Sequence, residues 1–290
     1  MATSFTGGRK KTVFAAESRE PFKISRSKID LFWECPRCFY LEQKLGVKRP
    51  STAPFTLNSA VDFLLKKEFD IHRAKGNPHP LMKKYGIDAV PYKHKDLDRW
   101  RHNFTGVQAL HQPTNFLVFG AVDDIWENAR GELHVVDYKA TSKDEVIDNL
   151  NETRWHNQYR RQMEVYQWLL RQNAFAVSDT GYFVYANAYR DREAFDGKLE
   201  FDVRVIPYAG SGDWIEDVLR RARKCLMSER IPETGELCEY CPYRESAGQA
   251  FRSAVRSGGG VAPAPERSST DEEHARDTHH TKSAASGTLF

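Results

Sequence analysis

The chain has 290 residues, of which 40% are hydrophobic and 12% aromatic, enough apolar side chains to bury a core over most of its length. Its formal net charge of +3 excludes the strongly basic overall composition typical of many nucleic-acid-binding domains. The charge is uneven, because residues 1–50 hold 11 Lys and Arg against 5 Asp and Glu, a local balance of 11 − 5 = +6. This pattern fits either a face that binds phosphates or a solvated tail followed by an ordinary charged helix.

No segment near Met1 resembles a signal-peptide core, and no segment approaches the ~20 apolar residues of a membrane span. We therefore expect a cytoplasmic protein with no membrane contact. In a reducing compartment its five cysteines are not expected to form structural disulfides, which favours metal binding by some of them.

Composition divides the chain into three parts. Residues 1–22 are polar without a sustained period and predict a flexible N-terminal tail. Residues 251–290 are rich in Ser, Gly, Ala, Pro, His and charge, and predict a disordered C-terminal tail because they cannot bury enough apolar surface. Residues 23–250 are expected to form one domain.

Within that domain the pattern predicts helices and strands in alternation. Ser27 indicates a helix start, Pro36 should end or kink this helix, and a second helix is expected to run to Gly46. The apolar patterns that follow predict an α/β core with a mixed sheet. In chain order they indicate a helix over 57–75, strands over 115–127 and 133–140, a helix over 156–173, strands over 180–188 and 199–206, and a helix over 212–228.

The turn between the first two strands predicts which carboxylates face each other. The sequence 128–131, Asn-Ala-Arg-Gly, suits a three-residue hairpin loop with glycine in the left-handed region. That loop pairs positions whose numbers sum to 260, so Asp123 lies opposite Asp137, and Lys139 shares the face of Asp137. A two-residue loop would place Asp124 there instead, because a one-residue slip turns every side chain to the other face.

Two carboxylates opposed across a ladder repel each other unless a cation or proton lies between them. Mg²⁺ or Mn²⁺ would suit Asp123 and Asp137, and Lys139 would be placed to orient a metal-activated water. The alternative is a solvated hairpin face on which Asp137 and Lys139 form a weak surface pair.

The helix that follows carries Gln162 and Tyr166 four residues apart, on one face. With the neighbouring Arg160 and Arg161, they offer an amide, a phenol and cations to a phosphate backbone. The alternative is that Tyr166 belongs to the core and Gln162 is simply exposed.

Four cysteines form two CxxC pairs, Cys35 with Cys38 and Cys238 with Cys241. Each pair has the spacing at which one ion binds two thiolates, and together they would complete a zinc site or an iron–sulfur ligand set. The alternative is four unconnected cysteines, and Cys225 is expected to be an inert packed thiol.

In combination, G-A-V-D at 120–123, V-V-D-Y-K at 135–139 and Q-M-E-V-Y at 162–166 resemble the PD-(D/E)XK nuclease superfamily, specifically its RecB-like branch with the CRISPR-adaptation nucleases. The resemblance covers roughly residues 23–247 and implies a restriction-endonuclease-like core, a central mixed sheet flanked by helices. It implies that Asp123 and Asp137 bind Mg²⁺ or Mn²⁺ with help from the Tyr138 carbonyl, and that Lys139 is the catalytic lysine. It further implies that Gln162 and Tyr166 contact DNA or support the site.

The sequence departs from this branch in two places. Members often carry a metal-binding His in the helix ahead of the hairpin, whereas residues 58–62 contain Asp62, which could serve as an oxygen ligand, and no His. Many members hold a four-iron cluster with one cysteine before the core and three after it, and the usual last cysteine is Ala247 here. Cys38 could restore the count, which leaves both a four-iron cluster and Zn²⁺ open.

The resemblance predicts a deoxyribonuclease that acts on single strands or ends, with DNA as partner and with repair, recombination or CRISPR-adaptation proteins as candidate partners. The first alternative is a catalytically degenerate nucleic-acid-binding protein of the same fold, which gains weight if Asp62 points away from the other two carboxylates. A second is a zinc-ribbon-like interaction protein, which predicts no cavity where Asp123, Asp137 and Lys139 converge.

Overall fold

The computed structural model describes residues 13–51 and 53–258. Contacts divide the chain into a first unit that ends at Glu236 and a second unit that begins at Leu237. No helix in the described ranges combines the length and the apolar composition needed to cross a membrane.

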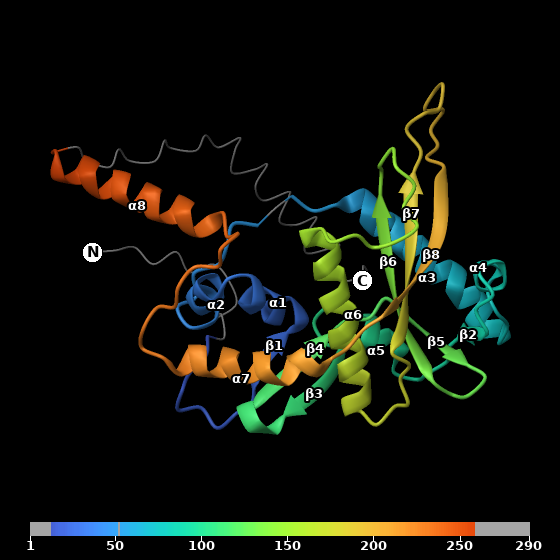
Figure 1. The fold of residues 1–290 in the computed structure, drawn as a ribbon, viewed down its shortest axis with the longest axis horizontal. Coiled ribbons are helices and arrows are strands. Elements are labelled where there is room, and N and C mark those ends of the chain that lie inside the picture. The colour runs from blue at the N-terminus through green and yellow to red at the C-terminus, as the bar shows by residue number, and fades with distance from the viewer. Residues whose placement is uncertain (1–12, 52, 259–290) are drawn as a thin grey trace, which may run out of the picture. The chain divides into compact units, whose positions relative to one another are not determined.

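The first unit contains seven α-helices among its described residues (Figure 1). The first helix ends at Glu34, just before Pro36, as expected. Pro36 begins the second helix, because proline is tolerated in the first turn of a helix, where the backbone N–H has no partner, and this helix ends at Gln43 rather than at Gly46. The helices are α1 (Arg26–Glu34), α2 (Pro36–Gln43), α3 (Thr56–Lys75), α4 (Pro80–Lys84), α5 (Leu97–Arg101), α6 (Arg154–Gln172) and α7 (Asp213–Met227), with a short 3₁₀ turn η1 at Gln112–Thr114.

The described residues of this unit form two sheets, both of them mixed. The larger has the order β2-β5-β6-β7-β8, with β6 and β7 parallel and the other neighbours antiparallel. The smaller has the order β1-β4-β3, with β1 parallel to β4. The strands are β1 (Phe22–Ser25), β2 (Ala89–Pro91), β3 (Val107–His111), β4 (Phe116–Gly120), β5 (Asp124–Asn128), β6 (Leu133–Thr141), β7 (Thr180–Ala188) and β8 (Phe201–Ala209).

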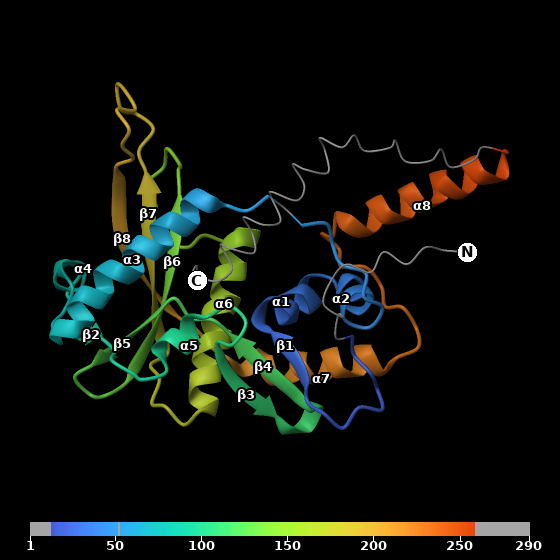
Figure 2. The same cartoon turned by 180° about the vertical axis from the view of Figure 1, so that it is seen from behind.

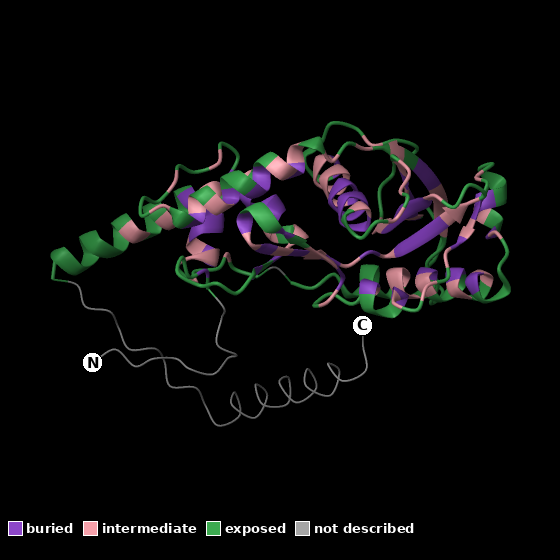
Figure 3. Cartoon of the chain, turned by 90° about the horizontal axis from the view of Figure 1, so that it is seen from below, coloured by how far each residue is buried: buried purple, intermediate pink, exposed green. Residues whose placement is uncertain are grey.

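Helices α3 and α6 cover opposite faces of the larger sheet (Figures 1, 2 and 3). Because successive side chains of a strand point to opposite faces, β6 sends Tyr138 toward α3, where it packs against Phe69. The same strand sends Asp137 toward α6, where it meets Gln162. The expected α/β fold with a mixed sheet and flanking helices is thus confirmed.

The hairpin between β5 and β6 has the predicted register. Asp124 pairs with Val136, so paired positions sum to 260, and Gly131 adopts a positive φ of 76° that closes the loop. The strand expected over 115–127 is not continuous, however. It divides into β4 and β5, which belong to different sheets, so Asp123 lies one residue before the ladder rather than within it.

Several predicted boundaries agree with the structure, including those of α3, α6, β7 and α7. The first helix begins at Arg26, with Ser25 rather than Ser27 at its N-cap position. The chain over 76–114, which the sequence pattern left without elements, forms α4, α5, β2 and β3. These elements are five residues long or shorter, too short for a periodic pattern to develop.

The second unit contains helix α8 (Tyr240–Arg256) among its described residues. The tail expected from residue 251 therefore begins with helix, because the Ala- and Arg-containing segment continues the last turns of α8. The rest of the predicted C-terminal tail from 259 onward, like residues 1–12 of the predicted N-terminal tail, lies outside the described residues. Within 13–22, Phe14 is buried and packs edge-on against Phe22.

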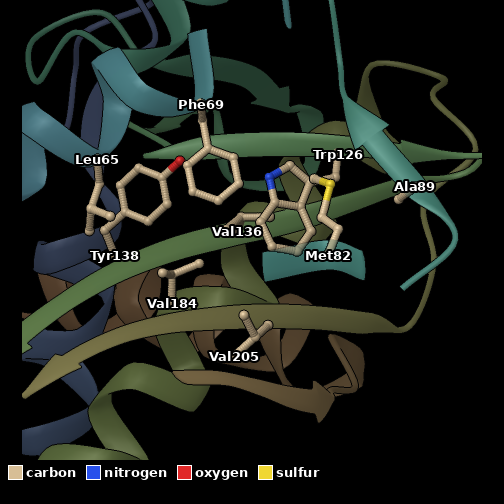
Figure 4. Packing of buried hydrophobic residues seen from close by; sticks show 9 residues of the cluster. All are labelled: Leu65, Phe69, Met82, Ala89, Trp126, Val136, Tyr138, Val184 and Val205. Carbon is tan, nitrogen blue, oxygen red and sulfur yellow. The ribbon is translucent and has the colours of Figure 1, made fainter. Parts of the chain in front are cut away.

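A hydrophobic cluster fixes α3 on the larger sheet (Figure 4). Phe69 stacks on Trp126 with ring centroids 5.4 Å apart and lies 5.6 Å from the ring of Tyr138. This packing orients the α3 turns that carry Asp62 and Lys66 toward the end of the hairpin. The cluster consists of Leu65, Phe69, Met82, Ala89, Trp126, Val136, Tyr138, Val184 and Val205.

Candidate active site

Asp123 lies where β5 begins, and both of its carboxylate oxygens have partners. Oδ2 accepts a hydrogen bond from the Tyr138 N–H at 3.0 Å, and Oδ1 lies 3.1 Å from the Lys66 ammonium. Burial alone would raise the pKa of Asp123, but the ammonium groups of Lys66 and Lys139 lower it below its ordinary value. Asp123 is therefore held ionised at neutral pH.

Asp137 and Lys139 lie together on the α6 face of β6. The Asp137 carboxylate is fully buried, Oδ1 accepts a hydrogen bond from Gln162 Nε2 at 2.8 Å, and Oδ2 forms an ion pair with the Lys139 ammonium. Oδ2 receives no hydrogen bond of good geometry from any described residue. The ammonium also lies 4.5 Å from the centre of the Tyr159 ring, which confines its position.

Burial sets the protonation of Asp137. Loss of solvent raises its pKa to about 7, and Asp123 adds to this rise while Lys139 opposes it. Burial lowers the pKa of Lys139, but the carboxylates of Asp137 and Asp123 raise it above its ordinary value. A carboxyl that titrates near neutral pH beside a fixed ammonium is typical of a functional site rather than of a solvated strand face.

Asp62 lies on α3 at the same end of the hairpin. Its Oδ2 is 2.8 Å from the Lys66 ammonium, which also contacts Asp123, so Asp62 is directed toward Asp123 rather than away from it. Burial and the Asp123 charge raise the pKa of Asp62, while Lys66 opposes the rise.

Gln162 and Tyr166 support these groups from α6. Gln162 Nε2 donates to Asp137 and lies 3.2 Å from the Tyr166 hydroxyl, while Gln162 Oε1 is 3.4 Å from the Lys139 ammonium. Tyr166 is buried, as a core residue would be, yet its hydroxyl reaches the carboxylate cluster. Arg26, which the sequence did not indicate, lies beside Tyr166 and Asp137; burial lowers its pKa and these neighbours raise it.

Arg160 and Arg161 point elsewhere. Arg160 pairs with Glu152 at 3.1 Å and donates to the Leu150 carbonyl, whereas Arg161 pairs with Asp30 at 2.5 Å. Their guanidinium groups attach α6 to neighbouring segments, and neither side chain lines the cleft at the carboxylates.

A cleft of about 450 Å³ opens over the cluster. Asp62, Asp123 and Lys139 line it, together with Phe55, Asn58, Ser59, Val61, Leu65, Tyr138, Ala140 and Tyr159. A larger cavity of about 630 Å³, near Tyr85 and His134, contains none of the expected site residues in its wall. The zinc-ribbon alternative predicts no cavity at this place, whereas Asp123 and Lys139 do line one; Asp137 is buried and is not among its lining residues.

The donor set at the cleft suits a hard divalent cation. Asp123 and Asp137 supply carboxylate oxygens, Asp62 supplies a third carboxylate nearby, and the Oδ2 atom of Asp137 is a buried acceptor without a well-directed N–H. Mg²⁺ and Mn²⁺ prefer such oxygen ligands, so the residues fit the ion.

Behind the cleft lies a buried ionic network that the sequence did not predict. Asp124, fully buried, forms ion pairs with Arg73 and Arg101 and accepts a hydrogen bond from the Tyr138 hydroxyl at 2.7 Å. Arg101 Nε also donates to the Asp123 carbonyl at 3.0 Å. The adjacent acids thus differ in surroundings: Asp123 faces the cleft, and Asp124 anchors the strand.

Two other residues that contact the site residues, Lys66 and Tyr159, escaped the sequence analysis, although a signal existed for each. Lys66 follows Asp62 by four residues in the predicted helix over 57–75, so the two share a face. Tyr159 precedes Gln162 by three residues, the other spacing at which helical side chains meet.

The two cysteine pairs belong to different units, Cys35 and Cys38 to the first and Cys238 and Cys241 to the second. In the first unit Cys35 and Cys38 are buried, and Cys35 Sγ accepts hydrogen bonds from the N–H groups of Cys38 at 3.4 Å and Gly235 at 3.3 Å. In the second unit Cys238 and Cys241 are buried at the start of α8. Burial raises the pKa of Cys225 to about 11, which agrees with an inert thiol.

The sequence and the fold were compared with those of known proteins. No curated protein matches the sequence. A solved structure titled "Crystal structure of SSO0001" is 15% identical, with a TM-score of 0.34, and the alignment covers 79% of this chain and 87% of that one. The sequence matches the PD-(D/E)XK nuclease superfamily over residues 84–246, more than half of the chain and a range that includes Asp123, Asp137 and Lys139. The chain belongs to the PD-(D/E)XK nuclease superfamily.

Proposed function

We propose that this protein is a metal-dependent nuclease that hydrolyses DNA phosphodiester bonds with Asp123, Asp137 and Lys139. The observation that carries the proposal is that Asp123 and Lys139 line one open cleft and that Lys139 is paired with Asp137, which is fully buried. A buried carboxylate that repels its neighbour is costly to keep unless a cation binds there.

Asp123 and Asp137, with the Tyr138 carbonyl, would hold Mg²⁺ or Mn²⁺, and Asp62 is the candidate for a further oxygen ligand. The bound ion would supply a water of lowered pKa and positive charge near the scissile phosphate. Lys139 is held over Tyr159 and hydrogen-bonded to Gln162. Its ammonium would orient the attacking water and offset negative charge in the transition state.

Three aromatic side chains support a single-stranded substrate. Phe55 and Tyr159 line the cleft, and Phe55 is 74% exposed. Trp155, 66% exposed, lies one helical turn before Tyr159 on α6 and shares its face. Exposed rings beside a cleft provide stacking surfaces for unpaired bases, which a duplex does not present.

We further propose that the four paired cysteines hold one Zn²⁺ or a four-iron cluster, as in the RecB-like branch. Cys35 Sγ already accepts two backbone N–H groups, an arrangement that stabilises a thiolate. Gly235 donates one of them, and Cys238 follows it by three residues, so the chain can extend no more than about 11 Å between them. A reducing compartment such as the cytoplasm would keep these thiols available.

The second candidate function is nucleic-acid binding without cleavage. It is favoured by Lys66, whose ammonium occupies the space between Asp62 and Asp123 at the helix where branch members often carry a metal-binding His. Repair, recombination or CRISPR-adaptation proteins remain the proposed partners for either function.

Cleavage of end-labelled single- and double-stranded DNA in Mg²⁺, Mn²⁺ or EDTA separates the two functions. We expect metal-dependent cleavage that falls by about 10²-fold or more in Asp137→Ala and Lys139→Ala. Lys143→Ala, which removes an exposed lysine after the same strand, is the matched control and should cleave as the unaltered protein does. Binding without cleavage, or cleavage equal in all variants, would overturn the catalytic assignment.

A further inference from the structure

Lys66 places a positive charge beside Asp62 and Asp123, two carboxylates that line the cleft. Its ammonium lies 2.8 Å from Asp62 Oδ2 and 3.1 Å from Asp123 Oδ1, and its side chain is only 18% exposed. Asp62 is four residues earlier on α3, so both side chains project from one face of a helix that the buried Leu65 and Phe69 pack against the sheet. The position of the ammonium is therefore set by the fold as well as by charge.

The carboxylate oxygens that would bind a metal already face cations or N–H groups. Lys66 contacts one oxygen of Asp123 and the Tyr138 N–H contacts the other. Gln162 donates to one oxygen of Asp137, and Lys139 pairs with the other. When all are ionised, three carboxylates (Asp62, Asp123 and Asp137), two ammonium groups and the Arg26 guanidinium give a local charge of −3 + 3 = 0.

We infer that Lys66 is the resident counter-cation of this site, which a divalent ion must displace from Asp123, and that Lys66 thereby restricts metal binding in the absence of nucleic acid. The inference rests on the proposed function. A phosphate group entering the cleft adds negative charge, offsets the ammonium and favours the metal again. Metal and nucleic acid therefore bind with positive coupling, and by linkage each raises the affinity of the protein for the other.

A purely structural role for Lys66 makes the opposite prediction. If the ammonium only held Asp62 and Asp123 in place, its removal would let the carboxylates separate and would weaken metal binding. If it is a competing cation, its removal frees oxygens of both carboxylates and strengthens metal binding. The sign of the change in metal affinity thus separates the two roles.

The test measures Mn²⁺ binding to the full chain without nucleic acid, by calorimetry or by the electron paramagnetic resonance of unbound Mn²⁺. Lys66→Gln keeps two N–H donors and removes the charge, and we expect it to bind Mn²⁺ about tenfold or more tightly than the unaltered protein. Lys67→Gln removes the same charge from the exposed neighbouring position and should change the affinity by less than about twofold. Equal or weaker binding by Lys66→Gln than by Lys67→Gln overturns the inference.

The variant Asp137→Asn distinguishes failure of the inference about Lys66 from failure of the proposed function. If the unaltered protein binds Mn²⁺ no better than Asp137→Asn does, the proposed metal site falls, and the inference falls with it. If Asp137→Asn weakens binding while Lys66→Gln leaves it unchanged, only the inference is overturned.

A second measurement does not depend on the folding of Lys66→Gln. The ¹⁵N resonance of the Lys66 ammonium in the unaltered protein, assigned by its absence from Lys66→Arg, should move in a saturable way as Mg²⁺ is added. A resonance that stays fixed while Mg²⁺ saturates the site would show that the ammonium keeps both partners, and it would overturn the displacement.

Discussion

Gly120 lies against the ring of Tyr166 so closely that a methyl group on Gly120 would come within 2.5 Å of Tyr166 Cε1. Gly120 ends β4, three residues before Asp123, and Tyr166 reaches the carboxylate cluster through Gln162. The glycine of the G-x-x-D motif is thus explained by the close approach of a ring to the backbone that leads into the site.

Gly120→Ala should therefore lower the free energy of unfolding by about 1–3 kcal/mol, because either the ring or the strand must move. In a Tyr166→Ala background the same substitution should cost much less, since the clashing atoms are gone. Chemical denaturation of the two single variants and the double variant measures this coupling. Additive effects would contradict the packing explanation.

The raised pKa of Asp137 predicts how stability depends on pH in the metal-free protein. The folded protein binds this proton up to a pH of about 7, whereas the unfolded chain loses it near its ordinary value of 3.8. The contribution is therefore present at low pH and is lost as pH rises toward 7, by about 4 kcal/mol for a shift of this size. Denaturation in EDTA should show Asp137→Asn gaining stability relative to the unaltered protein between pH 5 and 8; a constant difference would contradict the assignment.

Replacement by Asn should mainly reduce stability at Asp124 and mainly reduce cleavage at Asp123. Asp124→Asn leaves Arg73 and Arg101 without their buried counter-charge and should cost about 3–5 kcal/mol of stability. Asp123→Asn should abolish metal-dependent cleavage with a smaller loss of stability. Asp98→Asn, an exposed site on α5, is the control and should change stability by less than about 0.5 kcal/mol. Thermal denaturation and cleavage assays on all three variants measure both effects. A larger loss of stability for Asp123→Asn than for Asp124→Asn would contradict the prediction.

The exposed aromatic rings predict a preference for unpaired bases. Phe55→Ala and Trp155→Ala should each weaken binding of a single-stranded oligonucleotide by about 1–3 kcal/mol and change duplex binding much less. Phe104→Ala removes an equally exposed ring, 71% accessible, whose residue does not line the cleft. Fluorescence anisotropy in EDTA measures binding without cleavage, and an equal loss for single strands and duplexes would count against stacking.

The proposed metal site on the cysteines can be tested by measuring the iron and zinc content of the purified protein. Cys35→Ser and Cys238→Ser should each lose the bound iron or zinc of the anaerobically purified protein, because each removes one of four proposed ligands. Cys225→Ser should keep it, since burial raises the pKa of that thiol and disfavours the thiolate that a metal requires. Elemental analysis decides the outcome, and a brown colour would favour iron–sulfur over zinc. Metal retained in both ligand variants would rule out the four-thiolate site.

Local sequence determined the parts of this protein that depend on near neighbours. The turn at 128–131 set the register of β5 and β6, because loop length fixes which residues pair. Alternation along β6 then placed Asp137 and Lys139 together on one face and Tyr138 on the other. The motif residues were recognisable for the same reason, since the chemistry requires them at short, regular spacings.

Only the tertiary structure decided which distant side chains meet at that hairpin. Lys66 and Arg26 reach the carboxylates from helices 57 and 97 residues earlier in the chain than Asp123, and no local pattern encodes such contacts. The expected strand over 115–127 divides into β4 and β5 because β4 pairs with strands of the smaller sheet and β5 with strands of the larger one. One partner of each, β1 for β4 and β2 for β5, is distant in sequence. Burial, which raises the pKa of Asp137 to about 7, is a property of the whole packed core. The sequence indicated the candidate site residues, and packing determined their charge and their partners.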